Sequence, residues 1–240
     1  MRRRRFESKP PVPSPAGSRR RTIRAVSPAA PVRCVVFDLG GVLVRLAGSW
    51  ARACEVVGLP VRGEADSAAA RAARHDFVVA HEEGRLSHEG FLDAVVRSTG
   101  GVYTAAEVDA IHRAWVLDPY PGVDVLVREL RGARVLTGIL SNTNEVHWHE
   151  HVVKADRKLR VDVDHPHASH LLRARKPHRR IYDLFAAEAR VEPAHLLFFD
   201  DLADNVEGAR GAGWRAERID PTGDTAAQMR THLLALGVLR

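Results

Sequence analysis

Cysteine, lysine and long apolar runs are all scarce in this sequence of 240 residues. Its two cysteines, Cys34 and Cys54, are too few for a disulfide scaffold and favour a reducing compartment, so we expect a cytoplasmic protein. No apolar run is long enough to span a bilayer, and we expect no membrane-spanning segment. Only four of the 36 basic residues are lysines, which makes a lysine at a candidate site informative.

Positive charge is concentrated at the start of the chain. The formal net charge is +6, but residues 1–31 hold eight arginines and Lys9 against a single acidic residue, Glu7. The remainder is therefore slightly acidic, and its charge gives no indication of nucleic acid binding. Its composition, with 45% hydrophobic residues over the whole chain, is that of an ordinary folded protein.

Residues 1–31 form a basic tail that also holds six of the 13 prolines. Such a segment cannot bury enough apolar surface to fold, and we predict that it is disordered. One interpretation is an arm that contacts nucleic acid or anionic lipid. We favour a solvated extension or a start codon assigned too early, because runs of like charge are usually solvated. No apolar stretch follows the arginines, which argues against an export signal.

Short apolar runs alternate with helical patterns after residue 31. A run at 33–37 ends in Asp38-Leu-Gly-Gly41, and further strands are predicted at 135–140, 165–169, 196–199 and 214–219. Helices are predicted between them, at 123–131, after Pro177 and at 205–212. This alternation predicts an α/β fold, a Rossmann-like parallel sheet with helices on both faces.

Residues 49–117 show only helical patterns. Ser49, Ser87 and Thr104 precede three of four predicted amphipathic helices as N-caps, and the second helix is predicted from about Glu64 to His81. We therefore expect a small helical cap inserted after the first strand. The predicted domains are the tail at 1–31, a core at 32–48 and 118–240, and the cap at 49–117.

Polar groups follow the predicted strands at the points where they end. These groups are Asp38, Ser141-Asn142, Lys176 and Asp200-Asp201. Ligands of open parallel sheets bind beyond the carboxyl ends of the strands. Carboxylates gathered there suit a hard divalent cation, and a lysine with a hydroxyl suits phosphate oxygens.

Four motifs in order resemble the haloacid dehalogenase (HAD) superfamily. They are Val36-Phe-Asp-Leu-Gly-Gly-Val-Leu-Val44, Leu140-Ser-Asn-Thr-Asn144, Arg175-Lys-Pro177 and Phe198-Phe-Asp-Asp-Leu-Ala-Asp-Asn205. The resemblance covers about residues 32–220. The residues within and around these motifs are similar to those of the small helical-cap phosphatase branch, which includes alpha-D-glucose-1-phosphate phosphatase-like proteins.

The resemblance implies a Mg²⁺-dependent phosphatase that acts on a small phosphorylated metabolite. Asp38 would be the nucleophile that forms an aspartyl-phosphate, and Ser141 and Lys176 would take part in catalysis. The implied metal ligands are Asp38, the Gly40 carbonyl, Asp200 and Asp201, with Asn205 supporting them. The implied substrate-binding residues are Gly40, Gly41, Ser141, Asn142 and Lys176.

Gly40 departs from the family pattern, because HAD phosphatases usually have a general-acid aspartate at this position. The substrate would then carry a good leaving group, a cap residue would supply the proton, or turnover would be slow. The candidate proton donors in the cap are His81, Glu82, Glu83 and His88. Glu82, Glu83 and Arg85 are also candidates for substrate contact.

Two other functions stay open on the sequence. A 2-haloacid dehalogenase-type hydrolase also lacks the second aspartate, but two carboxylates beside Asp38 would repel one another without a cation. A low-activity phosphate-binding protein is compatible with Gly40. The His147-x-His149-x-His151 and His165-x-His167 patterns match no zinc motif, and we interpret them as surface or loop histidines. The oligomeric state is not predicted.

Overall fold

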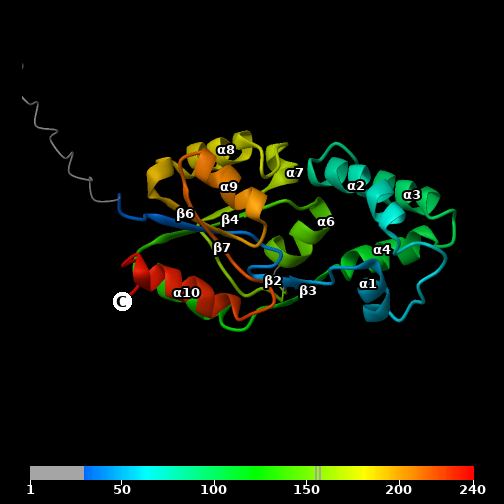
Figure 1. The fold of residues 1–240 in the computed structure, drawn as a ribbon, viewed down its shortest axis with the longest axis horizontal. Helices are drawn as coiled ribbons and strands as arrows, with labels where there is room; N and C mark the ends of the chain where they lie inside the picture. Colours follow the sequence, from blue (N-terminus) through cyan, green and yellow to red (C-terminus); the bar gives the residue numbers. More distant parts are fainter. Residues whose placement is uncertain (1–29, 155, 157) are drawn as a thin grey trace, which may run out of the picture.

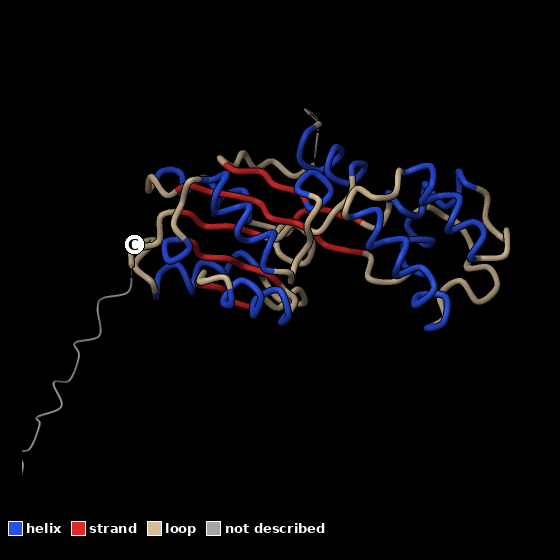
Figure 2. The backbone as a smooth tube through the Cα atoms, turned by 90° about the horizontal axis from the view of Figure 1, so that it is seen from above, coloured by secondary structure: helices blue, strands red, loops and turns tan. Residues whose placement is uncertain are grey.

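The computed structural model describes residues 30–154, 156 and 158–240. Apart from residues 30 and 31, the predicted basic tail lies outside the described residues. The centre is a five-stranded, fully parallel sheet in the order β5-β4-β1-β6-β7. Helices cover both of its faces (Figures 1 and 2), which confirms the predicted fold class.

The core elements follow the predicted alternation. In chain order they are β1 Cys34–Phe37, α5 Val123–Gly132, β4 Leu136–Ser141, α6 Glu145–Trp148, the π-helical turn η1 His149–Val153, β5 His165–Ala168, α7 Ser169–Leu172, α8 Arg179–Ala189, the 3₁₀ turn η2 Pro193–His195, β6 Leu196–Asp200, α9 Ala203–Gly211, β7 Arg215–Arg218 and α10 Thr225–Ala235.

Strand β1 lies at the centre of the sheet and packs into two separate apolar clusters. Because successive side chains point to opposite faces, Val35 and Phe37 join the cluster under α5 and α10, while Cys34 and Val36 join the cluster under α8 and α9. All four side chains are fully buried. This strand therefore requires an uninterrupted apolar run. Asp38 follows it directly and lies at the carboxyl end of the sheet.

A two-stranded antiparallel ribbon links the core to the cap helices. It consists of β2 Val44–Leu46 and β3 Val116–Pro119. The cap helices are α1 Trp50–Val56, α2 Ala68–Glu82, α3 His88–Ser98 and α4 Ala105–Arg113. They share an apolar cluster of their own, centred on residues such as Phe91, Tyr103 and Ile111. Figure 1 shows this bundle beside the carboxyl end of the sheet.

The predicted N-cap hydrogen bonds form at three helices of the inserted cap. Ser49, Ser87 and Thr104 each accept a hydrogen bond from a main-chain N–H of the following helix, and Thr104 and Glu107 complete a capping box. Helix α2 begins later than predicted, because Ser67 rather than a residue near Glu64 caps it.

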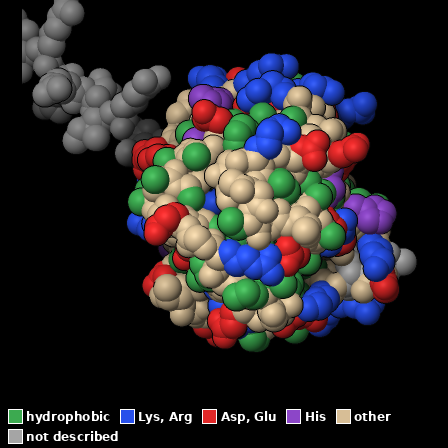
Figure 3. Space-filling view, turned by 90° about the vertical axis from the view of Figure 1, so that its right-hand side faces the viewer, with side chains coloured by type: hydrophobic (Ala, Val, Ile, Leu, Met, Phe, Trp, Pro, Cys, Tyr) green, Lys and Arg blue, Asp and Glu red, His purple; other side chains and the backbone are tan. Residues whose placement is uncertain are grey.

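The cap end of the molecule carries both signs of charge. Figure 3 shows both basic and acidic side chains on this face. Of the helices formed by the described residues, none has the length and apolar character needed to cross a bilayer.

A second attachment joins the cap to the core. At the end of α2, the Ser169 hydroxyl donates to the Glu82 carbonyl at 2.5 Å, and the Arg175 guanidinium pairs with the Glu82 carboxylate at 3.1 Å. The backbone is close as well, since a Cβ on Gly84 would lie 2.7 Å from the His170 carbonyl oxygen. We call this contact between the end of α2 and the segment 169–175 the latch.

Candidate active site

The predicted acidic residues meet at the carboxyl end of the sheet. One carboxylate oxygen from each of Asp38, Asp200 and Asp201 lies within 4.8 Å of the others. Asp38 follows β1, and Asp200 ends the neighbouring strand β6, so the parallel pairing of the two strands brings the carboxylates together. The Lys176 ammonium lies 2.9 Å from Asp38 Oδ1 and 2.7 Å from Asp200 Oδ2. We call these four residues the carboxylate–lysine cluster.

Lys176 is held in place by the side chain of Asn142. Its main-chain N–H donates to Asn142 Oδ1 at 2.8 Å, and the Asn142 amide donates to the Lys176 carbonyl at 3.0 Å. The lysine side chain is completely buried. The Asn142 side chain, which the resemblance assigned to phosphate binding, therefore positions the segment that carries the lysine.

Helix α9 supports this arrangement from behind. The Asn205 amide donates to both oxygens of Asp200, at 3.0 and 3.1 Å. A Cβ on Gly208 would lie 2.5 Å from the Pro177 carbonyl oxygen. The absence of a side chain at this position lets α9 approach the lysine segment closely.

Burial and charge perturb the titration of the cluster. The pKa of Asp38 is raised to about 7, and burial is the largest cause. The charge of Lys176 lowers this pKa, whereas the charge of Asp200 raises it further. Burial, then Asp200, also raises the pKa of Asp201. Burial alone would lower the pKa of Lys176, but Asp200 and Asp38 outweigh it, so the pKa is raised. The single positive charge of Lys176 does not balance the three carboxylates of the cluster. A bound cation would therefore be electrostatically favourable there.

These residues fit a magnesium ion. The carboxylates of Asp38, Asp200 and Asp201 are hard oxygen ligands, and they converge without any soft sulfur or imidazole ligand among them. A hard divalent cation would relieve their mutual repulsion.

The two glycines after β1 differ in their surroundings. Gly41 has φ +74°, and a Cβ there would lie 2.6 Å from Asp201 Cγ, so this position admits Asp201 only because it lacks a side chain. Gly40 faces Leu46 instead, and a Cβ there would lie 2.9 Å from Leu46 Cδ1. An apolar side chain therefore packs against the position where related phosphatases have the general acid.

A cavity of about 470 Å³ lies between this cluster and the cap. Asp38, Asp201, Gly40, Ser141 and Asn142 line it from the core. The cap and the ribbon contribute a largely apolar wall that includes Leu46, Val44, Trp50, Val78, Phe91, Val108, Ile111, Trp115 and Val116. The cavity can therefore enclose a small molecule with an apolar part beside the carboxylates.

Polar cap residues line the same cavity. Arg74 is 7% exposed, its guanidinium lies 4.6 Å from the centre of the Trp50 ring, and its Nη1 has no hydrogen-bond partner among the described residues. Glu82 lines the cavity too, and burial raises its pKa despite the nearby Arg175. Glu83 and Arg85 pair with each other at 2.6 Å, and neither lines the cavity. Of the three candidates for substrate contact, Glu82, Glu83 and Arg85, only Glu82 therefore faces the cavity.

Sequence reasoning missed Arg74 and the position of several histidines. Arg74 lies within an Ala-rich helix and resembles any solvated arginine in the sequence. His147 and His151 are buried rather than at the surface, at 6% and 7% exposure, which corrects our interpretation of that pattern. The His178-Arg179-Arg180 segment is exposed, and Arg179 pairs with Asp183.

Family comparison agrees with the motifs and the fold. Residues 32–213 match the model of the haloacid dehalogenase-like hydrolase family, so the chain belongs to this family of hydrolases. The resemblance drawn from the four motifs is thereby confirmed.

Individual relatives share parts of this architecture. "Phosphatase MT3486" of Mycobacterium tuberculosis (strain CDC 1551 / Oshkosh) is 33% identical over 120 residues, which are 50% of this chain and 55% of that protein. The match thus spans about half the length of this relative.

Among solved structures, the HAD family enzyme BT-2542 of Bacteroides thetaiotaomicron, in complex with magnesium and inorganic phosphate, has a TM-score of 0.67 at 21% identity, covering 83% of this chain and 100% of that one. The L-2-haloacid dehalogenase of Xanthobacter autotrophicus has a TM-score of 0.58 at 21% identity, covering 87% and 85% of the two chains. These likenesses concern the fold.

Proposed function

We propose that this protein is a Mg²⁺-dependent phosphatase that hydrolyses a small phosphorylated metabolite through an aspartyl-phosphate on Asp38. The observation that carries the proposal is the carboxylate–lysine cluster itself, with three carboxylate oxygens within 4.8 Å of one another and a buried ammonium 2.9 Å from Asp38. The magnesium complex of the BT-2542 enzyme and the name of the mycobacterial relative support it. Two buried free thiols agree with the cytoplasmic location that we predict.

In the proposed reaction, Asp38 attacks the phosphorus atom in line with the leaving oxygen. The ammonium of Lys176 neutralises charge on Asp38 and on the phosphoryl oxygens, and the Ser141 hydroxyl holds one of those oxygens. The bond from phosphorus to the leaving oxygen breaks as the bond to Asp38 forms. Water then attacks the phosphorus atom of the aspartyl-phosphate, which releases inorganic phosphate and restores the Asp38 carboxylate. When bound, Mg²⁺ would be held by Asp38, Asp201, the Gly40 carbonyl and Asp200, and it would supply charge neutralisation for the phosphoryl group. Positioning and electrostatics carry most of the rate in such transfers.

The surroundings of Gly40 restrict the substrate. A general acid contributes roughly 10²–10⁴-fold, or about 3–5 kcal/mol of barrier. With Leu46 packed at Gly40, that contribution is missing from the core side of the site. We therefore propose a substrate with a good leaving group, such as the oxygen of a phenol, a sugar anomeric oxygen or the carboxylate released from an acyl phosphate.

Phosphate release from a panel of phosphorylated metabolites, measured with Mg²⁺ and with EDTA, tests the function. We expect Mg²⁺-dependent hydrolysis that Asp38→Asn lowers on the order of 10⁴–10⁶-fold. Halide release from 2-haloacids in EDTA would instead establish the dehalogenase alternative. Binding of beryllofluoride with Mg²⁺ and no turnover would establish the phosphate-binding alternative.

A series of aryl and alkyl phosphates tests the role of Gly40. We expect the rate to fall steeply as the pKa of the leaving group rises. A flat dependence, with the chemical step shown to limit the rate, would mean that another residue donates the proton.

A further inference from the structure

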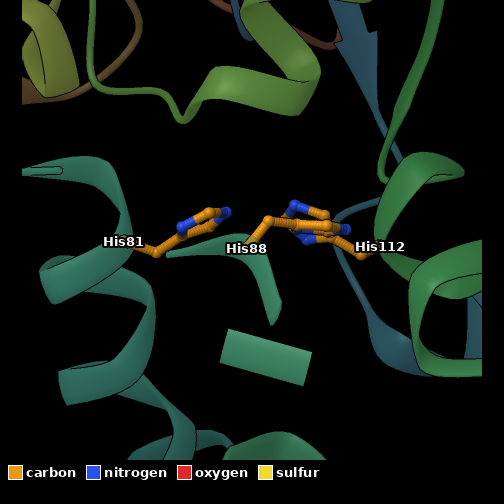
Figure 4. A group of neighbouring side chains, drawn as sticks. All are labelled: His81, His88 and His112. Atoms are coloured by element: carbon orange, nitrogen blue, oxygen red, sulfur yellow. The ribbon is translucent and has the colours of Figure 1, made fainter. Parts of the chain in front are cut away.

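Three histidines from three cap helices meet beside the cavity. His81 lies in the last turn of α2, His88 is the first residue of α3, and His112 lies in the last turn of α4. Their ring centres are 5.6, 5.7 and 5.5 Å apart, and one ring nitrogen of each lies within 4.8 Å of the others. Figure 4 shows His81 and His112 reaching toward each other from opposite sides, with His88 between them. We call this group the imidazole cluster.

Two of the rings have one nitrogen bonded and the other available. His81 Nδ1 bonds the Leu86 carbonyl at 3.0 Å, and His88 Nε2 bonds Asp109 Oδ1 at 2.6 Å. Because a carbonyl and a carboxylate only accept, these nitrogens carry the hydrogens, and in the neutral form of each ring the opposite nitrogen carries a lone pair. Among the described residues, His81 Nε2 and His88 Nδ1 are buried without a hydrogen-bond partner. His81 itself is only 3% exposed.

This pattern is the one that metal-bound histidines adopt. Their second ring nitrogen usually donates to a carboxylate or a backbone carbonyl, which fixes the tautomer and makes the ligating nitrogen more basic. Asp109 and the Leu86 carbonyl provide one partner of each kind.

The third ring is held by residues of the core. His112 Nε2 makes a long hydrogen bond of 3.4 Å to Asn144 Oδ1, and the His147 ring stacks on it with centres 4.2 Å apart. Both nitrogens of His147 have partners, since Nε2 bonds the His112 carbonyl and Nδ1 bonds the Asn144 amide. His147 is therefore a positioning residue, and the cluster offers three ligands.

The spacing suits a tetrahedral ion. Zinc–nitrogen bonds of about 2.0–2.1 Å in tetrahedral geometry place imidazole centres about 5.2 Å apart and ligating nitrogens about 3.4 Å apart. The observed ring centres are already 5.5–5.7 Å apart. An inward shift of less than about 1 Å by each ring brings the nitrogens to the bonding distance.

The surroundings of the imidazole cluster are partly apolar. The Phe91 ring, with centres 4.8 Å from His81 and 4.7 Å from His112, adds an apolar surface to the cluster. An apolar surface of this kind limits the access of solvent to the ring nitrogens.

We propose that His81, His88 and His112 bind a divalent transition-metal ion, best matched by Zn²⁺, at a site separate from the carboxylate–lysine cluster. Imidazole nitrogens select zinc-like cations, whereas carboxylates favour magnesium. Three protein ligands leave a fourth position for water or for a polar group of the molecule in the cavity that His112 lines. This site joins three cap helices and does not depend on the proposed phosphatase activity.

Cobalt titration of the full-length, tag-free protein tests the proposal. Saturating Mg²⁺ occupies the carboxylates, and the visible absorbance of Co²⁺ then reports on tetrahedral nitrogen coordination. We expect one equivalent of Co²⁺ to produce this absorbance and one equivalent of Zn²⁺ to displace it. Wild-type protein that shows no such absorbance, and no zinc binding by calorimetry, overturns the proposal.

Variants locate the site. His88→Gln and His112→Gln should abolish the absorbance, whereas Asp109→Asn should weaken zinc binding by about 10–100-fold because it removes the negative charge beside His88 and leaves the three rings in place. His149→Gln is the matched control, since His149 is an exposed histidine of the neighbouring turn and should bind as wild type. Circular dichroism verifies folding, and the partly exposed His88 is the site least disturbed by substitution. Unchanged cobalt spectra in folded His88→Gln protein overturn the proposal.

Discussion

The two sides of the cavity gather their polar residues in different ways. The carboxylate–lysine cluster is charged, and sheet topology assembles it, because parallel strands end at a common edge. The imidazole cluster has two rings whose pKa values are lowered, and it depends on how three cap helices pack. The comparison teaches that one cavity can offer oxygen ligands from a rigid sheet and nitrogen ligands from a small bundle. The predictions below test how far the two sides are independent.

The largest expected loss of stability comes from Lys176→Met. Removing one member of a buried ion pair costs about 3–5 kcal/mol, because the carboxylates of Asp38 and Asp200 stay buried without their cation. Urea unfolding with and without Mg²⁺ measures the loss, and we expect Mg²⁺ to recover part of it. Lys158→Met is the control, since the exposed Lys158–Asp118 pair should contribute at most about 1 kcal/mol. Equal losses in the two variants would contradict the prediction.

Gly41→Ala separates strain from displacement of Asp201. A non-glycine residue at φ +74° costs about 1–3 kcal/mol, and the added Cβ would also push against Asp201. The matched control is Gly48→Ala, at φ +73° with no atom within 4 Å of the added Cβ. We expect similar backbone costs in thermal unfolding but loss of Mg²⁺-dependent turnover in Gly41→Ala alone. Full activity in Gly41→Ala would show that Asp201 can move without consequence.

Arg74→Met tests the cap side of the cavity. If the substrate places an anionic or carbonyl oxygen against Arg74, the loss of a charged hydrogen bond of about 1.5–3 kcal/mol should raise KM by about 10–100-fold with kcat nearly unchanged. Stability should hold or increase, because the guanidinium that is removed is buried and its Nη1 has no hydrogen-bond partner among the described residues. Arg97→Met, at an exposed position of α3, serves as the control. An unchanged KM would give Arg74 a purely structural role.

The smallest effect concerns the capping box of α4. Hydrogen bonding to Arg62 is the first cause that lowers the pKa of Glu107, from 4.5 to about 2. The folded state therefore releases this proton more readily than the unfolded state, and the stabilisation is present above about pH 4.5 and lost as the pH falls through about 2. Glu107→Gln should lower the Tm slightly at pH 7 and not at pH 2. A difference that persists at pH 2 would contradict the electrostatic origin.

The sheet and its charged edge were predictable because each depends on local sequence. Val35 and Phe37 lie in an uninterrupted apolar run, which is what a strand covered on both faces requires, and Asp38 follows at once. The short ribbon strands were not predicted, because β2 spans only three residues, too few for an alternating pattern to be distinguished in the sequence. Helix α10 was missed as well, since it buries Leu233 yet exposes Leu234.

The missing parts of the site depend on contacts between distant residues. Asn142 bonds the main chain of a residue 34 positions later, and no side-chain pattern records such a partner. The imidazole cluster combines residues 81, 88 and 112, whose spacing follows no helical or metal-binding period. The regular spacing of histidines around His149 did not indicate this cluster. The packing of α4 against α6 determines which rings meet, and the sequence does not record that packing.

The latch has a consequence for movement of the cap relative to the core. The cap is tied to the core at the ribbon and again where Ser169 and Arg175 hold Glu82. Any widening of the cavity by movement of the cap therefore requires the breaking of a few polar contacts at the second tie. A molecule too large for the mouth of the cavity would enter or leave no faster than those contacts break.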